Sequence, residues 1–174
     1  AKFIRDVENG EIVYIENNEL KSIKPFPLKK SRPCVFEYIY FARPDSILNG
    51  QCAYEYRKNF GIELAKEANV EGDLIVPVPD SGNAAAIGYS QHVGKKFELG
   101  IIRNHYVGRT FIEPVQKIRS LGVKLKLNAN KSSIKNKKII LVDDSLVRGT
   151  TSHKIVKMLY DAGAKEVHVR IASP

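Results

Sequence analysis

Tryptophan is absent from this 174-residue chain, and cysteine occurs only at Cys34 and Cys52. Two cysteines are too few for the disulfide framework on which small secreted domains depend. No apolar run approaches the roughly 20 residues that span a bilayer, and residues 1–5 do not resemble a secretory signal. These absences predict a protein that is neither secreted nor inserted in a membrane, and we expect it in the reducing cytoplasm.

Acidic side chains are also in deficit, because 28 lysines and arginines face 19 aspartates and glutamates and leave a formal net charge of +9. The excess is concentrated in residues 117–138, which carry several lysines, one arginine and no carboxylate. Such a run favours an anionic partner, either nucleic acid, a phosphorylated metabolite or an acidic surface. A solvated basic face explains the same run, and both interpretations stay open here.

The first thirty residues differ in pattern from the rest of the chain. Residues 12–15 form a strand-like run between turn signals, and Pro25, Pro27, Lys29 and Lys30 indicate a linker. Beyond the linker, strand-like and helical patterns alternate, which predicts an α/β fold with a largely parallel sheet flanked by helices and a short β appendage at the N-terminus. The expected strands are 35–41, 74–78, 139–142 and 167–171, and the expected helices lie at 53–64, from 84 onward and at 155–160.

Two of these elements carry further signals. Pro77 lies near the end of the run at 74–78, and because proline cannot donate a backbone hydrogen bond, it favours an edge strand or a strand end. The last helix is expected to stop at Gly163, since glycine suits the left-handed position that ends many helices.

The most informative segment is residues 139–152, where four apolar residues precede Asp143 and Asp144, and a short loop with Gly149 leads into a helix. In open α/β sheets, ligands bind beyond the carboxyl ends of the strands, so the two acids emerge where a ligand belongs. The loop amides and the helix N-terminus suit a phosphate group, and the acids suit sugar hydroxyls or a hydrated cation. In the alternative interpretation, Ser145, Thr150 and Thr151 are helix caps and the acids form a solvated strand end, although capping does not require two adjacent carboxylates.

At residues 142–151 the sequence resembles the phosphoribosyltransferases, whose fingerprint is four apolar residues, two acidic residues and a small Gly/Thr-rich phosphate loop. Three further stretches, 34–46, 76–82 and 103–112, are similar to one family in that class, the amidophosphoribosyltransferases. The resemblance covers nearly the whole chain and implies a type I phosphoribosyltransferase-like fold. It also implies a glycosyltransferase that moves an amino group from ammonia, or from glutamine in the full-length enzyme, to phosphoribosyl pyrophosphate. The products are phosphoribosylamine and pyrophosphate, at the first step of de novo purine synthesis.

The resemblance assigns the two aspartates and the turn at 80–82 to substrate and metal binding. Asp143 and Asp144, together with Ser81, would hold Mg²⁺, which prefers hard oxygen ligands. For Ser81, a plain N-cap of the helix that begins near Asn83 is the alternative. The implied substrate-binding residues are Asp80, Ser81, Gly82, Asp143, Asp144, Ser145, Val147, Arg148, Gly149, Thr150 and Thr151.

The stretch at 103–112 is similar to the family's flexible loop, and its implied catalytic residues are Arg103, Tyr106 and Arg109. Closure of that loop would exclude water and bring cations to the leaving pyrophosphate as negative charge develops there.

The sequence also departs from the family. Residues 1–30 are interpreted as the end of an N-terminal glutaminase domain plus a linker, and residues 31–174 as a phosphoribosyltransferase domain truncated at its C-terminus. Because the chain begins with Ala1 and not with the nucleophilic cysteine of that glutaminase domain, we expect at most ammonia-dependent transfer. Cys34 matches the first ligand of an iron–sulfur cluster found in one branch of the family. A single thiolate does not hold a 4Fe-4S cluster, so we expect the cluster only in the full-length protein.

The implied partners are phosphoribosyl pyrophosphate, ammonia, pyrophosphate, purine nucleotides as inhibitors, the missing glutaminase domain and further copies of the chain in a homo-oligomer. One rival function is a regulatory protein that senses phosphoribosyl pyrophosphate and binds nucleic acid through residues 117–138. That run lacks interleaved aromatic residues for base stacking, so we do not expect a nucleic-acid partner. The other rival is a salvage enzyme acting on a free base, for which only Tyr106 and Phe111 offer stacking surfaces.

Overall fold

The computed structural model describes residues 2–67, 70–104, 106 and 126–173. The chain divides into two compact units, Ala1–Cys34 and Val35–Pro174. Within the described ranges, no helix combines the length and the apolar character needed to cross a membrane.

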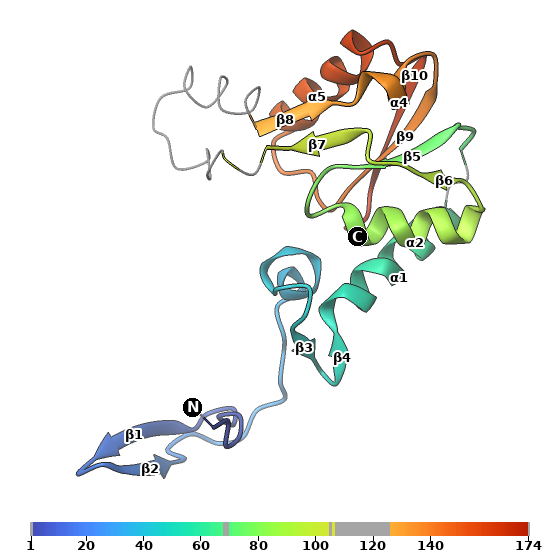
Figure 1. The fold of residues 1–174 in the computed structure, drawn as a ribbon. Coiled ribbons are helices and arrows are strands. Elements are labelled where there is room, and N and C mark those ends of the chain that lie inside the picture. The colour runs from blue at the N-terminus through green and yellow to red at the C-terminus, as the bar shows by residue number, and fades with distance from the viewer. Residues whose placement is uncertain (1, 68–69, 105, 107–125, 174) are drawn as a thin grey trace. The chain divides into compact units, whose positions relative to one another are not determined.

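The first unit contains an antiparallel hairpin, in which β1 (Ile12–Glu16) pairs with β2 (Glu19–Ile23) (Figure 1). Asn17 and Asn18 form its turn with φ values of 51° and 62°. Two successive residues with positive φ give the twist that suits a two-residue hairpin, and asparagine tolerates this conformation well. The strand expected at residues 12–15 is confirmed, whereas the polar sequence of β2 carries no clear strand signal.

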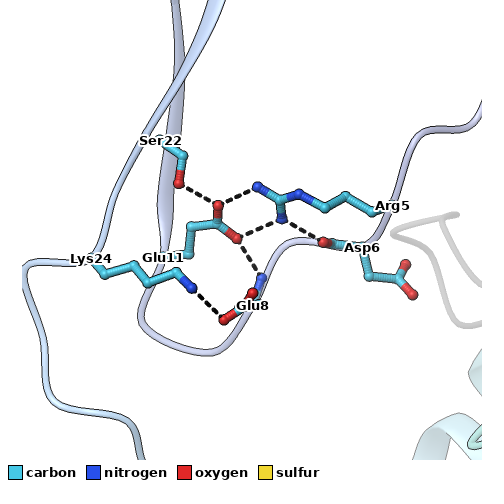
Figure 2. A network of polar contacts seen from close by, with 6 residues as sticks. All are labelled: Arg5, Asp6, Glu8, Glu11, Ser22 and Lys24. Carbon is cyan, nitrogen blue, oxygen red and sulfur yellow. Dashed lines mark hydrogen bonds and ion pairs between the residues drawn. The ribbon is translucent and has the colours of Figure 1, made fainter.

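Glu11 is the centre of a polar network beside this hairpin (Figure 2). Its carboxylate accepts hydrogen bonds from the Arg5 guanidinium at 2.5 and 2.8 Å, from the Glu8 N–H at 2.7 Å and from the Ser22 hydroxyl. These donors, Arg5 above all, hold the pKa of Glu11 well below its usual range. Lys24 adds an ion pair with Glu8 at 2.6 Å. Because none of the described apolar residues in this unit is buried, such polar contacts carry much of its local order.

The second unit is organised on a four-stranded sheet in the order β10-β9-β5-β6, in which all neighbouring strands are parallel. The strands are β5 (Leu74–Pro77), β6 (Lys96–Phe97), β9 (Lys138–Asp143) and β10 (Glu166–Ile171). The predicted α/β fold with a parallel sheet is therefore confirmed. Pro77 is the last residue of β5, which confirms the strand-end interpretation. The edge alternative is wrong, because β5 lies between β9 and β6.

Both faces of this sheet are covered, as expected for strands with continuous apolar runs. One face packs against α1 (Ala53–Glu67) and α2 (Asn83–Val93), and the other against α5 (Thr150–Asp161) (Figure 1). Successive side chains of β9 alternate between the two layers, with Ile139 and Leu141 on the α5 side and Ile140 and Val142 on the α1–α2 side. Three shorter elements complete the α5 side, and they are β7 (Ile101–Arg103), β8 (Leu127–Ala129) and α4 (Lys131–Ile134).

Helices α1 and α2 approach each other through glycine. The position where a Gly61 side chain would begin is occupied by the main chain of Ala85, and the corresponding position at Gly88 is occupied by the main chain of Lys58. A methyl group at either site would overlap a carbonyl oxygen of the partner helix. This close crossing fixes the start of α2, and therefore the turn that precedes it.

The strand predicted at residues 35–41 is wrong. Glu37–Phe41 form a short π-helix, η1, followed by a small hairpin of β3 (Ile47–Leu48) and β4 (Gln51–Cys52). Only Ile39 of η1 is buried, while its aromatic neighbours remain largely exposed. A short apolar run does not distinguish a strand from a helical turn by itself. Here the helical form is supported by Arg57 of α1, which donates to carbonyl oxygens of this segment.

Candidate functional site

The turns that follow β5 and β9 lie side by side, because these neighbouring parallel strands end at the same edge of the sheet. Pro77 is paired in register with Val142, and the Val78 N–H donates to the Val142 carbonyl oxygen at 2.8 Å. The sequence-predicted residues 80–82 follow one strand, and the predicted acids follow the other. The sheet thus brings together two segments that are about sixty positions apart in the sequence.

The acid pair after β9 is held tightly by its own main chain and by the end of β10. The Asp143 carboxylate accepts the Asp144 N–H at 2.9 Å, and the Asp144 carboxylate accepts the Ser145 N–H at 2.8 Å. Ala172 and Ser173 donate their N–H groups to the carbonyl oxygens of Asp143 and Asp144 at 2.9 and 2.8 Å. Asp144 is only 8% exposed, and its Oδ2 is buried without a hydrogen-bond partner among the described residues.

Asp143 titrates far from its usual range. Burial raises the pKa of Asp143 to about 7, and the adjacent Asp144 carboxylate adds to the rise as a hydrogen-bonding partner and as a like charge. The N–H bond from Asp144 acts in the opposite direction and is the smaller effect. A carboxyl group perturbed by burial and by a second acid is typical of a functional site, because a purely structural strand end gains nothing from such a pair.

The turn after β5 is packed directly against β9. The peptide bond between Pro79 and Asp80 is cis. A side chain at Gly82 would begin 2.5 Å from the Val142 carbonyl oxygen, so only glycine lets the turn lie this close to β9. Gly82, which has no side chain, also holds the N-cap position of α2. The interpretation of Ser81 as the cap is therefore wrong, and Ser81 instead lines a cavity together with Asp144.

The loop between the acid pair and α5 is open to solvent. Leu146 and Val147 are 56% and 87% exposed, and Arg148 is exposed as well. Gly149 occupies the N-cap position of α5 with φ of 69°, a conformation that favours glycine. The cap position therefore belongs to none of Ser145, Thr150 and Thr151. An exposed loop that leads into a helix N-terminus offers unpaired N–H groups to an anion.

The three predicted catalytic residues are not equally well placed by the fold. Arg103 ends β7 and forms an ion pair with Asp80, which brings it to the turn after β5. Tyr106 is fully exposed, so it packs against nothing in the described part of the chain. Arg109 lies outside the described residues, as do Phe111 and the first part of the basic run, residues 117–125.

Arg57 belongs to this neighbourhood, although the sequence patterns gave it no role. It is 8% exposed and lines a small cavity with Ser81, Asp144, Ala172 and the apolar side chains Ile39, Phe60 and Ala85. The buried residues of α1 are at positions 53, 57, 61 and 65. The last three follow directly after Tyr56, Phe60 and Leu64, which recur at helical spacing in the sequence. An arginine at helical spacing among alanine and glycine is the signal that would have revealed it.

A parallel sheet, an acid pair after one of its strands and an open loop before a helix are the features by which this chain can be placed in a class of proteins. The sequence matches the family described as "Phosphoribosyl transferase domain" over residues 47–172, which include both turns and the acid pair. The chain therefore belongs to the phosphoribosyltransferase domain family.

Comparisons over the whole of this chain show which phosphoribosyltransferases it is similar to, and they are amidophosphoribosyltransferases. Over its whole length the chain is 59% identical to the amidophosphoribosyltransferase of Rhizobium etli and 51% identical to that of Archaeoglobus fulgidus, and it covers 36% and 38% of those proteins. These matches confirm the resemblance carried by residues 34–46, 76–82, 103–112 and 142–151.

Solved structures agree with the sequence comparison. The "glutamine phosphoribosylpyrophosphate (PRPP) amidotransferase from B. subtilis complexed with ADP and GMP" matches 98% of this chain with a TM-score of 0.83 and 50% identity. A structure described as "the allosteric regulatory enzyme of purine biosynthesis" matches with the same TM-score and 49% identity. The chain covers 38% and 37% of these two proteins, so it spans somewhat more than a third of the relatives it matches.

Proposed function

We propose that this chain supplies the phosphoribosyltransferase part of an amidophosphoribosyltransferase. The reaction is the transfer of an amino group from ammonia to phosphoribosyl pyrophosphate, which yields phosphoribosylamine and pyrophosphate. One observation carries the proposal: an acid pair, in which Asp144 is buried and Asp143 half-buried, and an exposed, glycine-containing loop before a helix meet at one sheet edge. The acids suit a sugar or a cation and the loop suits a phosphate, and this substrate contains a sugar with a phosphate on one side and a pyrophosphate on the other.

In the proposed reaction, the nitrogen lone pair of ammonia forms a bond to the anomeric carbon of the ribose. The bond from that carbon to the pyrophosphate oxygen breaks, and its electron pair leaves with pyrophosphate. The new amine then releases one proton to solvent. Catalysis rests on holding the reactants and on stabilising the charge that develops on the leaving group, so no side-chain nucleophile is required. We assign the stabilisation of the leaving group to Arg103, because its ion pair with Asp80 places it at the turn after β5. Tyr106 and Arg109 are assigned the same role from the family resemblance.

Each part of the substrate has a proposed set of contacts. The loop at 145–151 would bind the 5′-phosphate through its N–H groups and hydroxyls, and Asp143 and Asp144 would bind the ribose hydroxyls. The turn at 80–82 would meet the pyrophosphate. The full proposed set is Asp80, Ser81, Gly82, Asp143, Asp144, Ser145, Val147, Arg148, Gly149, Thr150 and Thr151.

Mg²⁺ is the proposed cofactor, with Asp143, Asp144 and Ser81 as its protein ligands. The donors fit this ion, because all three offer hard oxygen atoms and the buried Oδ2 of Asp144 has no partner among the described residues. Ser81 and Asp144 also line the same cavity. Within the described ranges, no three His, Cys, Asp or Glu side chains gather in one place, so water and substrate oxygens would complete the shell. When bound, the ion would neutralise charge on the pyrophosphate.

The remaining partners follow from the longer relatives. We infer that purine nucleotides inhibit the enzyme, a view supported by the relative that was solved with ADP and GMP. Residues 1–30 are proposed to be the end of a glutaminase domain, and the division of the chain after Cys34 falls close to that boundary. Cys34 is exposed and Cys52 half-buried, and two thiols do not hold a 4Fe-4S cluster, which is proposed only for the full-length protein. Assembly into a homo-oligomer and a cytoplasmic location stay predictions.

The proposal is tested with the 174-residue chain, Mg²⁺, phosphoribosyl pyrophosphate and an ammonium salt. Pyrophosphate release reports turnover, and the rise of the thermal midpoint with substrate and Mg²⁺ reports binding, since a ligand that binds only the folded state stabilises it. We expect the wild-type chain to show the thermal shift, and the double variant Asp143→Asn with Asp144→Asn to lose it.

Glu166→Gln is the matched control, because Glu166 is a carboxylate at the opposite end of the same sheet, where it pairs with Lys138 at 3.0 Å. This variant should keep the full ligand response. If the double aspartate variant responds to the ligand as the wild type does, the acid pair is not part of the site and the proposal fails.

A further inference from the structure

Arg57 is a cation buried beneath the proposed site. Its guanidinium is anchored from η1: the Nε donates to the Tyr38 carbonyl oxygen at 2.9 Å, and Nη2 donates to the Ala42 carbonyl oxygen at 2.7 Å. Burial of a charged group is unfavourable unless hydrogen bonds compensate for the lost water, and these carbonyl oxygens do so. Arg57 therefore fastens η1 to α1, and its position is fixed from both elements.

Arg57 also lies near Asp144, one member of the acid pair. Arg57, Ser81 and Asp144 line one small cavity, in which Asp144 contributes a buried carboxylate whose Oδ2 has no partner among the described residues. Burial lowers the pKa of Arg57, and attraction to Asp144 acts in the opposite direction. The two opposite charges thus interact across a space with little solvent, where screening is weak.

A fixed cation at this place has a clear consequence for the acids. Asp143 and Asp144 are adjacent and repel each other when both are ionised. A positive charge beside Asp144 offsets that repulsion and favours one orientation of its carboxylate. Groups that orient a ligand-binding carboxylate through hydrogen bonds or charge commonly control its affinity, although they never touch the ligand themselves.

We propose that Arg57 is a positioning residue: anchored by the carbonyl oxygens of Tyr38 and Ala42, it orients the Asp144 carboxylate for the ribose and its cation. The packing of η1 against α1 thereby controls the affinity of the site for the ribose and its cation. This inference rests on the proposed phosphoribosyl site and adds a residue that none of the sequence motifs contains.

Arginine suits this role better than lysine. Its planar guanidinium donates to two carbonyl oxygens at once in a residue that also lines the cavity, whereas an ammonium group is a single point of charge on a flexible stem. Arg57→Lys keeps the charge and loses this fork. Arg57→Met keeps much of the apolar stem and loses the charge.

The ligand experiment measures the affinity for ribose 5-phosphate in the presence of Mg²⁺ by isothermal titration calorimetry. We expect Arg57→Met to weaken binding about 10- to 100-fold, as is typical when a supporting group around a metal-binding carboxylate is removed, and Arg57→Lys to restore part of the loss. Arg43→Met is the control, since Arg43 pairs with exposed Asp45 at 2.8 Å and lies in the same segment. Wild-type affinity in Arg57→Met, or in Arg57→Lys, would overturn the inference.

A second measurement needs no ligand and separates this inference from the proposed function. Unfolding free energies of the wild type, Arg57→Met, Asp144→Asn and the double variant form a cycle, and we expect the double variant to lose less than the sum of the single losses. Additive losses overturn the positioning role. If the cycle shows coupling but the wild type does not bind ribose 5-phosphate, the proposed function fails while the link between Arg57 and Asp144 stands. Arg57→Met serves here because it removes the charge that interacts with Asp144 and keeps much of the apolar stem.

Discussion

Arg103 at the end of β7 forms an ion pair with Asp80 in the turn after β5, although the two residues are 23 positions apart. The pair is partly open to solvent, with side-chain exposures of 31% and 52%. The Nε of Arg103 is buried and has no partner among the described residues. A guanidinium with donors to spare thus already lies beside the turn that we assign to pyrophosphate.

The first prediction concerns Arg103→Gln. Removing the guanidinium should weaken binding of inorganic pyrophosphate about tenfold, because a hydrogen bond to a charged group contributes about 1.5 kcal/mol or more. The thermal midpoint should change little, since a solvent-exposed ion pair contributes at most about 1 kcal/mol. Calorimetric titration and thermal unfolding measure the two effects separately.

Lys96→Gln is the control for this prediction, because Lys96 is an exposed residue of β6 that forms an ion pair with Glu98 at 2.7 Å. It should leave pyrophosphate binding unchanged. A variant at Arg103 that binds pyrophosphate as tightly as the wild type would remove this residue from the site.

The centre of the fold could be predicted from the sequence because its determinants are local. Residues 139–142 and 74–78 are continuous apolar runs, as strands covered on both faces require. The end of α5 follows from Gly163, which has φ of 95° in the structure. The acids at 143 and 144 follow a buried strand, and the carboxyl end of a strand in such a sheet is where ligands bind.

The parts that could not be predicted depend on contacts between distant residues. The apolar run at 35–41 forms η1, in which a helical turn is held by Arg57, 19 and 15 positions from its acceptors at Tyr38 and Ala42. No local pattern encodes such a partner. The position of Arg103 beside Asp80 likewise depends on how β7 packs against the core on the α5 side of the sheet, and only the family resemblance indicated it.

The second prediction is a pH dependence of stability. The pKa of Asp143 is raised to about 7 in the folded chain by burial and by Asp144, from an ordinary value of 3.8. Between these values the folded state holds a proton that the unfolded state has released. The free energy of unfolding should therefore fall as the pH rises from about 4 to about 7, and it should stay level above that. This group accounts for a fall of up to a few kcal/mol.

Urea unfolding without divalent cations, followed from about pH 5 to about pH 8, measures this dependence. In Asp143→Asn the fall should be much smaller, because the amide does not titrate. A divalent cation should add more stability at the upper end of this range, where Asp143 is ionised and can coordinate it. Parallel curves for the wild type and Asp143→Asn would contradict the assignment.

The third prediction tests the crossing of α1 and α2. In Gly61→Ala the new methyl group would overlap the carbonyl of Ala85, so the helices must separate. Overpacking of this kind costs about 1–3 kcal/mol, and the thermal midpoint should fall by about 2–4 °C for each kcal/mol lost. Circular dichroism at increasing temperature measures the change.

Glu63→Ala places an alanine at an exposed position of the same helix, where it should be nearly neutral apart from the loss of an exposed ion pair with Lys66. Because the crossing also fixes the start of α2, Gly61→Ala should weaken ligand binding at the turn that contains Ser81, whereas Glu63→Ala should not. Equal midpoints in the two variants would show that the helices do not need glycine here.

The last prediction concerns the loop before α5 and uses two glycines with similar positive φ values. Gly149 has φ of 69° and Gly50, between β3 and β4, has φ of 82°, and a side chain at either would meet nothing within 4 Å. Alanine at each position carries the same conformational penalty, about 1 kcal/mol, with no steric overlap. Their effects on stability should therefore be similar, while only Gly149→Ala changes the loop whose N–H groups are proposed to bind the 5′-phosphate.

We expect about a tenfold loss of affinity for ribose 5-phosphate in Gly149→Ala and none in Gly50→Ala, measured by calorimetry with Mg²⁺ present. Equal affinities in the two variants would mean that the phosphate binds elsewhere.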